Sequence, residues 1–243
     1  MAKNNYYGKR LTDNNIHQYL KEVYGSGQVI RRRKILNIPE LFQSDYGAIN
    51  DCTLTSMTSC LSYLLKINDY NKIYNVIQSI ANNNNYYNEK NGTNPLKIKK
   101  IYDTAYFRLS GEKRNSKSGY FKNVCVTEDV IRNIFNNNLP IILNFVNDGR
   151  NYYHNHSVTV IGYIDYKYNN GNVMALMVYD NWFKNVAYID FKKLSLICSI
   201  NYWQQHTNSF VVASFHKKWL STGILDVKMY AIFFQRIGDI IWY

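Results

Sequence analysis

Apolar residues recur at helical spacing along much of the first half of the chain. Between residues 52 and 65, Leu54, Met57 and Leu61 fall on one face, which is typical of a helix packed against a core. The same pattern predicts helices over 13–24 and 127–135, and over most of 69–109, where Pro95 opens a second segment. The first half of the chain is therefore expected to be mainly helical.

The second half changes to short apolar or alternating runs, which are typical of strands. Strands are predicted over residues 141–146, 156–165, 173–180, 186–190, 200–204 and 209–215, with a polar turn at 166–172. Earlier in the chain, 29–38 is expected to be extended, whereas the first 12 residues are interpreted as a loose leader and 111–119 as a loop. Helices followed by antiparallel strands indicate an α+β fold whose two halves face each other across a cleft.

Composition narrows the class of protein. The 243 residues are 46% hydrophobic and 16% aromatic, enough for one large domain with small appendages. The net charge is +12, but the only tight basic run is 31–34, and no mixed basic and aromatic stretch stands out. We therefore expect a solvated basic surface and no nucleic-acid partner.

The spacing of the cysteines and the length of the apolar runs bear on metal sites, disulfides and cellular location. The four cysteines are widely spaced and form no C-x-x-C pair, so neither a zinc site nor a disulfide framework is predicted, and no metal or cofactor is expected. The first ten residues contain no apolar signal-like core, and no run of about 18 apolar residues occurs. A cytoplasmic protein without a transmembrane segment is therefore expected.

Reactive residue types occur at three predicted element ends. Cys52 starts a predicted helix, where unpaired N–H groups and the helix dipole favour a thiolate, and Asn50 and Asp51 before it are typical N-cap residues. His156 starts a predicted strand, and Asp180 ends the next one. In an antiparallel pair these positions lie side by side, so the carboxylate is expected to hold the imidazole ring. The other three cysteines are interpreted as packing residues.

These residues carry a resemblance. The chain has a cysteine at a helix start, then His-x-Val-x-x-x-Gly-Tyr at 156–163, then Asp-Asn-Trp at 180–182. This order resembles papain-type cysteine peptidases. An aspartate as third residue, and Asp51 directly before Cys52, bring it closer to the bacterial peptidase C39-like branch, which resembles the leader-cleaving peptidases of bacteriocin exporters. The resemblance covers about residues 40–215.

The resemblance implies a papain-like α+β fold, in which a helical N-terminal half carrying the cysteine helix packs on a C-terminal antiparallel sheet. It divides the chain into an N-terminal extension with a short helix (1–39), the peptidase domain (40–215) and a C-terminal extension of unknown role (216–243). That last stretch is rich in Ile, Phe, Trp and Tyr. It is expected to add a strand or helix to the core, and contact with a partner or a membrane surface stays open.

The resemblance also implies roles for individual residues. Cys52 would be the nucleophile, His156 the general base and Asp180 its orienting partner. Such folds place an oxyanion-hole glutamine about six residues before the cysteine. Here Gln43 lies nine before it and is the first candidate, with Asn50 as the second. Trp182 would either shield the His–Asp pair or be an ordinary core residue.

The expected function is a cysteine peptidase that cleaves a peptide or isopeptide bond of a peptide or protein substrate through a thioester. Two alternatives stay open. The same triad serves acyl transfer of the transglutaminase type, in which an amine replaces water as acceptor. A catalytically inactive papain-like module would bind peptides without cleaving them. The sequence does not separate these three.

Overall fold

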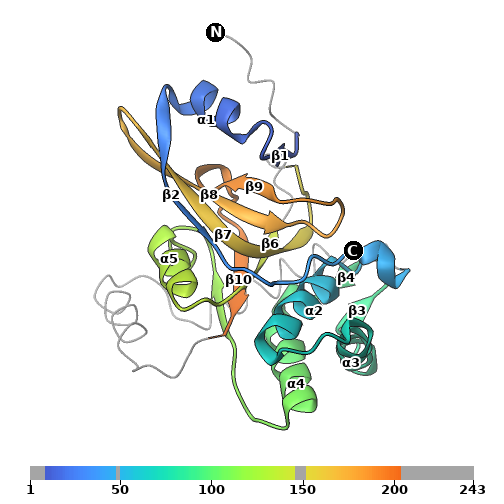
Figure 1. Ribbon diagram of the computed structural model, residues 1–243. Coiled ribbons are helices and arrows are strands. Elements are labelled where there is room, and N and C mark those ends of the chain that lie inside the picture. The colour runs from blue at the N-terminus through green and yellow to red at the C-terminus, as the bar shows by residue number, and fades with distance from the viewer. Residues whose placement is uncertain (1–8, 48–49, 146–151, 204–243) are drawn as a thin grey trace, which may run out of the picture. The chain divides into compact units, whose positions relative to one another are not determined.

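An antiparallel sheet with helices packed against it organises the chain (Figure 1). The computed structural model describes residues 9–47, 50–145 and 152–203, all within one compact unit, Met1–Gln204. The predicted strand 209–215 and the expected extension 216–243 lie outside the described residues. Across the described ranges, no helix combines the length and apolar character needed to span a bilayer.

The eight strands of the main sheet are all paired antiparallel. Along the sheet their order is β1-β9-β8-β7-β6-β10-β5, and β2 also pairs with β7. Their bounds are β1 Leu11–Thr12, β2 Gly27–Lys34, β5 Lys117–Tyr120, β6 Ile141–Phe145, β7 His156–Tyr168, β8 Gly171–Tyr179, β9 Ala187–Asp190 and β10 Cys198–Tyr202. The long central β7 pairs with β6 over its first residues and with β2 beyond Gly162, so the two share one of its edges.

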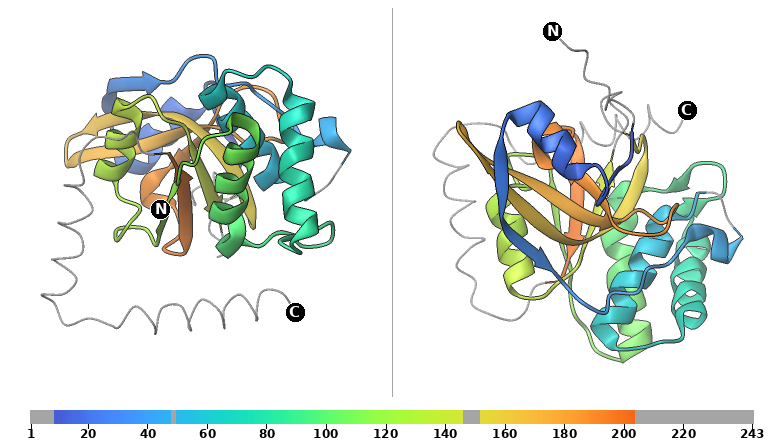
Figure 2. Two further views of the ribbon diagram at one scale, coloured as in Figure 1. Left: turned by 90° about the horizontal axis from the view of Figure 1, so that it is seen from below. Right: turned by 45° about the horizontal axis from the view of Figure 1, so that its top comes forward.

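The helices form separate groups around this sheet. Their bounds are α1 Ile16–Tyr24, α2 Cys52–Leu65, α3 Tyr70–Asn83, α4 Ile98–Ser110 and α5 Glu128–Asn136. Helices α2, α3 and α4 pack together beside the sheet, and α2 touches β6 and β7, as Figures 1 and 2 show. Helix α5 packs its Phe135 ring on Tyr163 of β7, while Tyr166, on the other face of that strand, bonds the end of α1 through Gly25.

Local sequence explains where several helices start and stop. The side chains of Asp69 and Thr127 accept hydrogen bonds from the backbone N–H groups of Lys72 and Val130, which caps α3 and α5. A 3-10 turn, Pro95–Lys97, leads into α4, which ends at Gly111 in the left-handed conformation.

The predicted α+β class is confirmed, and each predicted helix and strand within the described residues has a counterpart. Three expectations were wrong. The leader contains β1, the loop at 111–119 contains the start of β5, and the range expected to be helical contains a small hairpin of β3 (Tyr87–Asn88) and β4 (Gly92–Thr93). These strands are too short to show a periodic pattern. In addition, β1 and β5 pair with strands that are distant along the chain, and local periodicity carries no information about such partners. The turn expected over 166–172 is also shorter, because both strands of the hairpin continue into it.

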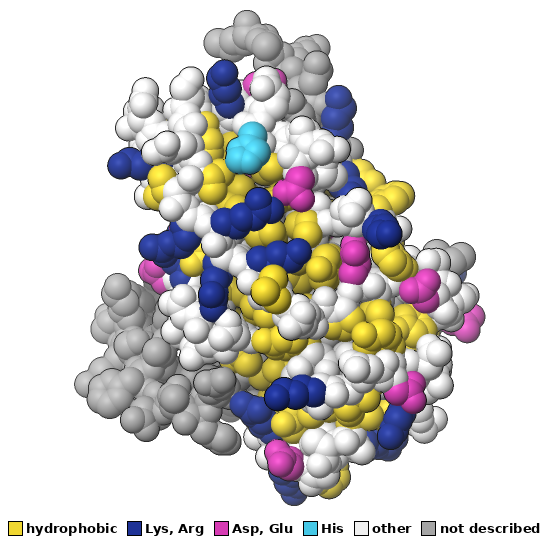
Figure 3. Space-filling view, in the orientation of Figure 1, with side chains coloured by type: hydrophobic (Ala, Val, Ile, Leu, Met, Phe, Trp, Pro, Cys, Tyr) yellow, Lys and Arg dark blue, Asp and Glu magenta, His cyan; other side chains and the backbone are white. Residues whose placement is uncertain are grey.

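The basic run lies on β2, and acidic groups offset part of its charge. Arg32 forms an ion pair with Asp13 at 3.1 Å, and Arg31 lies 3.8 Å from Asp165. In the space-filling view, Lys and Arg side chains are distributed over the face shown, with acidic side chains between them (Figure 3). This face carries a mixed surface, not one continuous basic patch.

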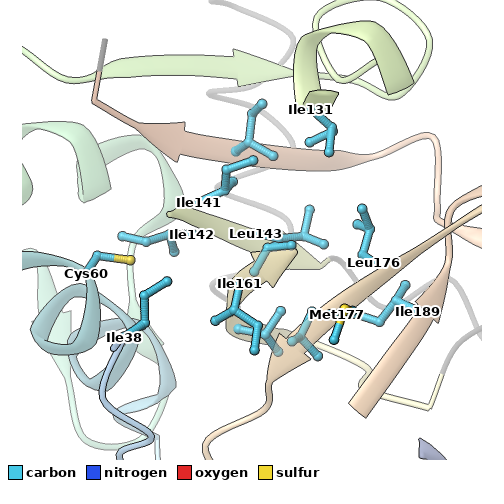
Figure 4. Close-up of a cluster of buried hydrophobic side chains, with 14 of the residues drawn as sticks. Ile38, Cys60, Ile131, Ile141, Ile142, Leu143, Ile161, Leu176, Met177 and Ile189 are labelled. Atoms are coloured by element: carbon cyan, nitrogen blue, oxygen red, sulfur yellow. The ribbon is translucent and has the colours of Figure 1, made fainter. Parts of the chain in front are cut away.

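The core connects the helical group to the sheet. Figure 4 shows apolar side chains of β6 to β9 packed together, with Cys60 of α2 beside Ile142. Strand β6 is buried along its whole length, and β7 is buried from His156 to Tyr166. Burial of this continuous surface packs α2 against β6 and β7.

Asp51 occupies the N-cap position of α2, but its side chain does not cap the helix as expected. The side chain is fully buried and instead accepts a hydrogen bond from the Tyr74 hydroxyl. Burial raises the pKa of Asp51, and the charge of Glu89 adds to the rise, against a hydrogen bond from Tyr87. Hydrogen bonds from Tyr74 and Tyr87 thus hold the carboxyl group away from the first turn of α2.

Gly162, the glycine of the His-x-Val-x-x-x-Gly-Tyr pattern, lies opposite Lys34 where β2 pairs with β7. A Cβ added there would lie 2.1 Å from the backbone oxygen of Arg33. We predict that Gly162→Ala lowers the free energy of unfolding by about 1–3 kcal/mol, because the two strands must separate. Gly119→Ala is the matched control, since its nearest contacts, the Cβ and the backbone oxygen of Cys125, lie at 3.2 and 3.3 Å and require only a small shift. Equal losses in urea unfolding would contradict this account.

The raised pKa of Asp51 makes a prediction about stability. A carboxyl group with a raised folded pKa stabilises the fold fully below its unfolded pKa, about 4, and loses that contribution as the pH rises through the folded pKa. The unaltered chain should therefore lose stability relative to Asp51→Asn as the pH rises from 4 to 7. Urea unfolding at each pH measures the difference. If the difference in the free energy of unfolding between the two proteins does not change with pH, the pKa of Asp51 is not raised in the folded state.

Candidate active site

Cys52 is the first residue of α2, at the end of the helix that faces the sheet. The residue is partly exposed, whereas residues 53–62 behind it are buried. As the first helical residue, its backbone N–H has no partner within the helix, and the positive end of the helix dipole lies beside the sulfur. Cys52 is thus a partly exposed residue whose environment favours the thiolate.

His156, the first residue of β7, lies beside this thiol and is 4% exposed. Burial raises the pKa of Cys52. The charge of the His156 ring, a hydrogen bond with that ring, and hydrogen bonds from the Ser157 backbone and the Thr53 side chain outweigh burial, so the pKa lies below that of an ordinary thiol. The structure therefore brings the two expected side chains together and favours a thiolate.

The other cysteines provide a comparison. Burial raises the pKa of Cys60 and of Cys198 to about 12 in each case, so these thiols stay neutral. Both fit the expected packing role. Cys125 does not, because it is exposed in the turn that precedes α5. Cys52 is set apart from the two buried thiols by its imidazole neighbour.

The contact between His156 and Asp180 differs from the one expected. Nε2 of the ring lies 2.7 Å from the backbone oxygen of Asp180, not from its carboxylate. Because a carbonyl oxygen only accepts, Nε2 carries the proton of this bond. Nδ1 is then the ring nitrogen that remains to exchange a proton with the Cys52 thiol. Asp180 thus still orients the ring, but through its main chain.

The Asp180 carboxylate is fully buried and has other partners. One oxygen accepts from the Arg10 guanidinium at 2.5 Å and from the Tyr153 hydroxyl at 3.2 Å. The other accepts from the backbone N–H groups of Trp182 and Phe183, at 3.2 and 3.0 Å. These contacts explain why the carboxylate turns away from the imidazole: it closes the turn that follows β8.

Aromatic rings cover the imidazole. The Trp182 ring lies over His156 with centroids 3.9 Å apart, and Tyr153 stacks on the same imidazole at 5.6 Å. The Tyr152 ring in turn meets Trp182 edge-on at 6.2 Å. Trp182 therefore packs on the imidazole itself, which it shields from solvent on that side.

Asn181, between the two residues singled out in the sequence, ties the start of α2 to the sheet. It adopts a left-handed conformation, with φ of 62°. Its side-chain N–H₂ group lies within hydrogen-bond distance of the backbone oxygens of Cys52 and Ser157, both at 3.1 Å, and of the Ser56 hydroxyl at 2.8 Å. One buried amide thus spans the gap between the cysteine helix and the histidine strand.

A second buried tie starts from the residues next to the reactive pair. The hydroxyls of Thr53 and Ser157 are 2.7 Å apart, and Ser157 donates to Asn144 of β6 at 2.7 Å. Asn144 continues the chain of hydrogen bonds to Ser199 and Asn201 of β10. Thr53 and Ser157 directly follow Cys52 and His156, so this bond sets the spacing of the reactive pair.

The two candidate oxyanion donors differ in position. The side-chain amide of Asn50 donates to the backbone oxygens of Glu89 and Lys90, at 2.7 and 3.1 Å, so it is engaged with the β3–β4 turn. Gln43 starts the 3-10 turn Gln43–Tyr46, and its backbone N–H donates to the oxygen of Asn181 at 3.1 Å. The backbone of Gln43 therefore bonds to Asn181, the residue whose side-chain amide contacts Cys52.

The sequence interpretation missed several site residues. Thr53, Asn144 and Ser157 are polar residues at buried positions of apolar elements, and that mismatch was the available signal. Asn181 and Arg10 gave no signal in a single sequence, because their partners are distant along the chain. In the part of the chain that the structure describes, no three His, Cys, Asp or Glu side chains converge as metal ligands would.

Comparison with known proteins gives the family. The family model described as "Peptidase_C39 like family" matches residues 35–211. A search of curated proteins finds no match. The match covers most of the chain and includes the Cys52 helix, the strand that starts at His156 and the turn that holds Asp180. It agrees with the papain-like arrangement of helices and sheet. The chain therefore belongs to the Peptidase_C39-like family, which indicates a function of the cysteine peptidase type.

Proposed function

We propose that the protein is a cysteine peptidase in which Cys52 and His156 cleave a peptide or isopeptide bond. The observation that carries the proposal is the hydrogen-bonded contact between this thiol and this imidazole, with the thiol pKa lowered. A lowered thiol pKa beside a histidine is the arrangement that produces a nucleophilic thiolate near neutral pH. The family membership supports the same reaction class.

In the first step the Cys52 thiolate attacks the carbonyl carbon of the scissile bond. The carbonyl oxygen becomes an oxyanion, which the backbone N–H of Cys52 and the side chain of Gln43 would stabilise. The proton that the thiol gave to Nδ1 of His156 passes to the leaving amine. The C–N bond breaks, the amine departs, and the acyl group remains on the sulfur as a thioester.

In the second step Nδ1 of His156 takes a proton from water, which attacks the thioester carbonyl. The C–S bond breaks, the acid product leaves, and the proton returns to the Cys52–His156 pair. Acyl transfer would follow the same path with an amine in place of water. Hydrolysis is the proposal because the family match indicates a function of the cysteine peptidase type.

Asp180 has a different role here from the one expected of a triad carboxylate. Its backbone oxygen accepts a hydrogen bond from Nε2–H of His156. This bond would keep Nδ1 directed at the sulfur. Its carboxylate acts one step further away, by holding the turn that positions this oxygen. The Trp182 ring excludes water from the imidazole and from this bond.

Alkylation with iodoacetamide tests the reactive pair. We predict that at pH 6 Cys52 is alkylated about tenfold or more faster than the exposed Cys125, because only thiolates react and each unit of pKa changes the thiolate fraction tenfold. His156→Ala should abolish the advantage, and His154→Ala, an exposed histidine two residues earlier, should retain it. Mass spectrometry of each peptide gives the rates. Equal rates at both cysteines would refute the proposal.

Cleavage itself requires a separate test. We predict that the protein incubated with a peptide library in H₂¹⁸O produces new carboxyl termini carrying ¹⁸O, because water releases the thioester. Cys52→Ala should abolish this and Cys125→Ala should not. If new amide bonds form only when an amine is added, the reaction is acyl transfer. If Cys52 is reactive but no product of either kind forms, the site binds peptides without cleaving them.

A further inference from the structure

Arg10 lies at the centre of a group of contacts that the proposed mechanism does not use. Its Nε lies 2.5 Å from an Asp180 carboxylate oxygen. The carboxylate side chain is fully buried, and the side chain of Arg10 is 15% exposed. Among the residues that the structure describes, Arg10 is the cation that forms an ion pair with Asp180. A buried carboxylate without such a partner would be strongly destabilising.

The same guanidinium also binds the segment that follows. Its Nη2 donates to the backbone oxygen of Asn185 at 2.8 Å and lies 3.3 Å from that of Phe183. The guanidinium stands over the Phe183 ring, 5.5 Å from its centroid. Arg10 therefore joins both ends of the 180–185 turn, which a single point charge could not do.

The position of Arg10 is fixed from its own side. The next two residues form β1, which pairs with β9, Leu11 opposite Tyr188. The side chain of Asn15 donates to the backbone oxygen of Arg10 at 3.1 Å, while accepting from the Thr12 N–H at 2.7 Å. The pairing of β1 with β9 and the bond from Asn15 thus fix the backbone of Arg10. It also lies before residue 35, where the family match begins.

We propose that Arg10 is a positioning residue of the active site, which holds the 180–185 turn so that the Asp180 carbonyl keeps the His156 ring aimed at Cys52. This inference rests on the proposed function. The connection is direct, because the carboxylate that Arg10 holds and the carbonyl that holds the imidazole belong to the same residue. The turn moves if either the ion pair or its backbone bonds are lost.

The other groups that contact Asp180 do not supply the positive charge that Arg10 provides. Tyr153 donates its hydroxyl to the carboxylate, and burial, followed by the negative charge of Asp180, raises the pKa of this tyrosine, so it remains a neutral donor. His156 meets the backbone of Asp180, and the N–H groups of Trp182 and Phe183 are neutral. Among the residues that the structure describes, removal of Arg10 would therefore leave the carboxylate with neutral donors only.

The test compares Arg10→Met and Arg10→Lys with Arg32→Met in the full chain. Arg32 is the matched control, since it pairs with Asp13 in the same N-terminal region but is more than half exposed. For each variant, the alkylation rate of Cys52 relative to Cys125 is measured from pH 5 to 9, with thermal unfolding recorded separately. Arg10→Met should raise the midpoint of the Cys52 profile and slow alkylation at pH 6 about tenfold. Arg10→Lys should shift it less, and Arg32→Met not at all.

The outcomes separate this inference from the proposed function. If Arg10→Met folds and its Cys52 profile matches that of the unaltered chain, Arg10 is only a stabilising residue and the inference is wrong, even if the melting temperature falls. If Arg10→Met does not fold, Arg10→Lys decides, because lysine keeps the charge but not the forked contacts; an unshifted profile there overturns the inference. If Cys52 of the unaltered chain reacts no faster than Cys125, the proposed function fails, and the inference fails with it.

Discussion

The attachment of the start of α2 to the start of β7 is the constraint on which the site depends. The two elements come from opposite halves of the chain, and apolar burial alone would allow them to slide. Directional bonds remove that freedom: the Thr53 and Ser157 hydroxyls are 2.7 Å apart, and the Asn181 amide reaches both Cys52 and Ser157. Since Cys52 and His156 directly precede the first bonded pair, the spacing of the reactive groups follows from the bond.

This attachment also explains how one helix can hold two thiols of opposite character. Cys60 lies two turns beyond Cys52, deep in the packing of Figure 4, where burial raises its pKa to about 12. At the helix start burial acts in the same direction, but the imidazole beside Cys52 outweighs it. Charge compensation therefore decides the state of the thiol, and that compensation exists only while the helix start stays attached to β7.

Local sequence predicted the elements because their signals are local. Helical spacing and the alternation after His156 each report on a few neighbouring residues. The juxtaposition of Cys52 and His156 followed from combining two such ends with a family resemblance. β1 could not be predicted in this way, because a two-residue strand has no period and its partner β9 lies far along the chain.

The sequence also predicted that Asp180 contacts the His156 ring, but not that the contact is made by its backbone oxygen. Asp180 could offer either a carboxylate or a carbonyl, and the choice depends on what else competes for the carboxylate. Arg10 and the Trp182 and Phe183 N–H groups bind it, and Arg10 comes from the opposite end of the chain.

A carboxylate held in this way stabilises the turn, and the turn supplies a neutral acceptor whose direction is fixed by the backbone. The imidazole is then oriented by geometry, while the negative charge that would stabilise its cation is shared with a guanidinium. Orientation of His156 and compensation of charge are thus assigned to different atoms of the same residue.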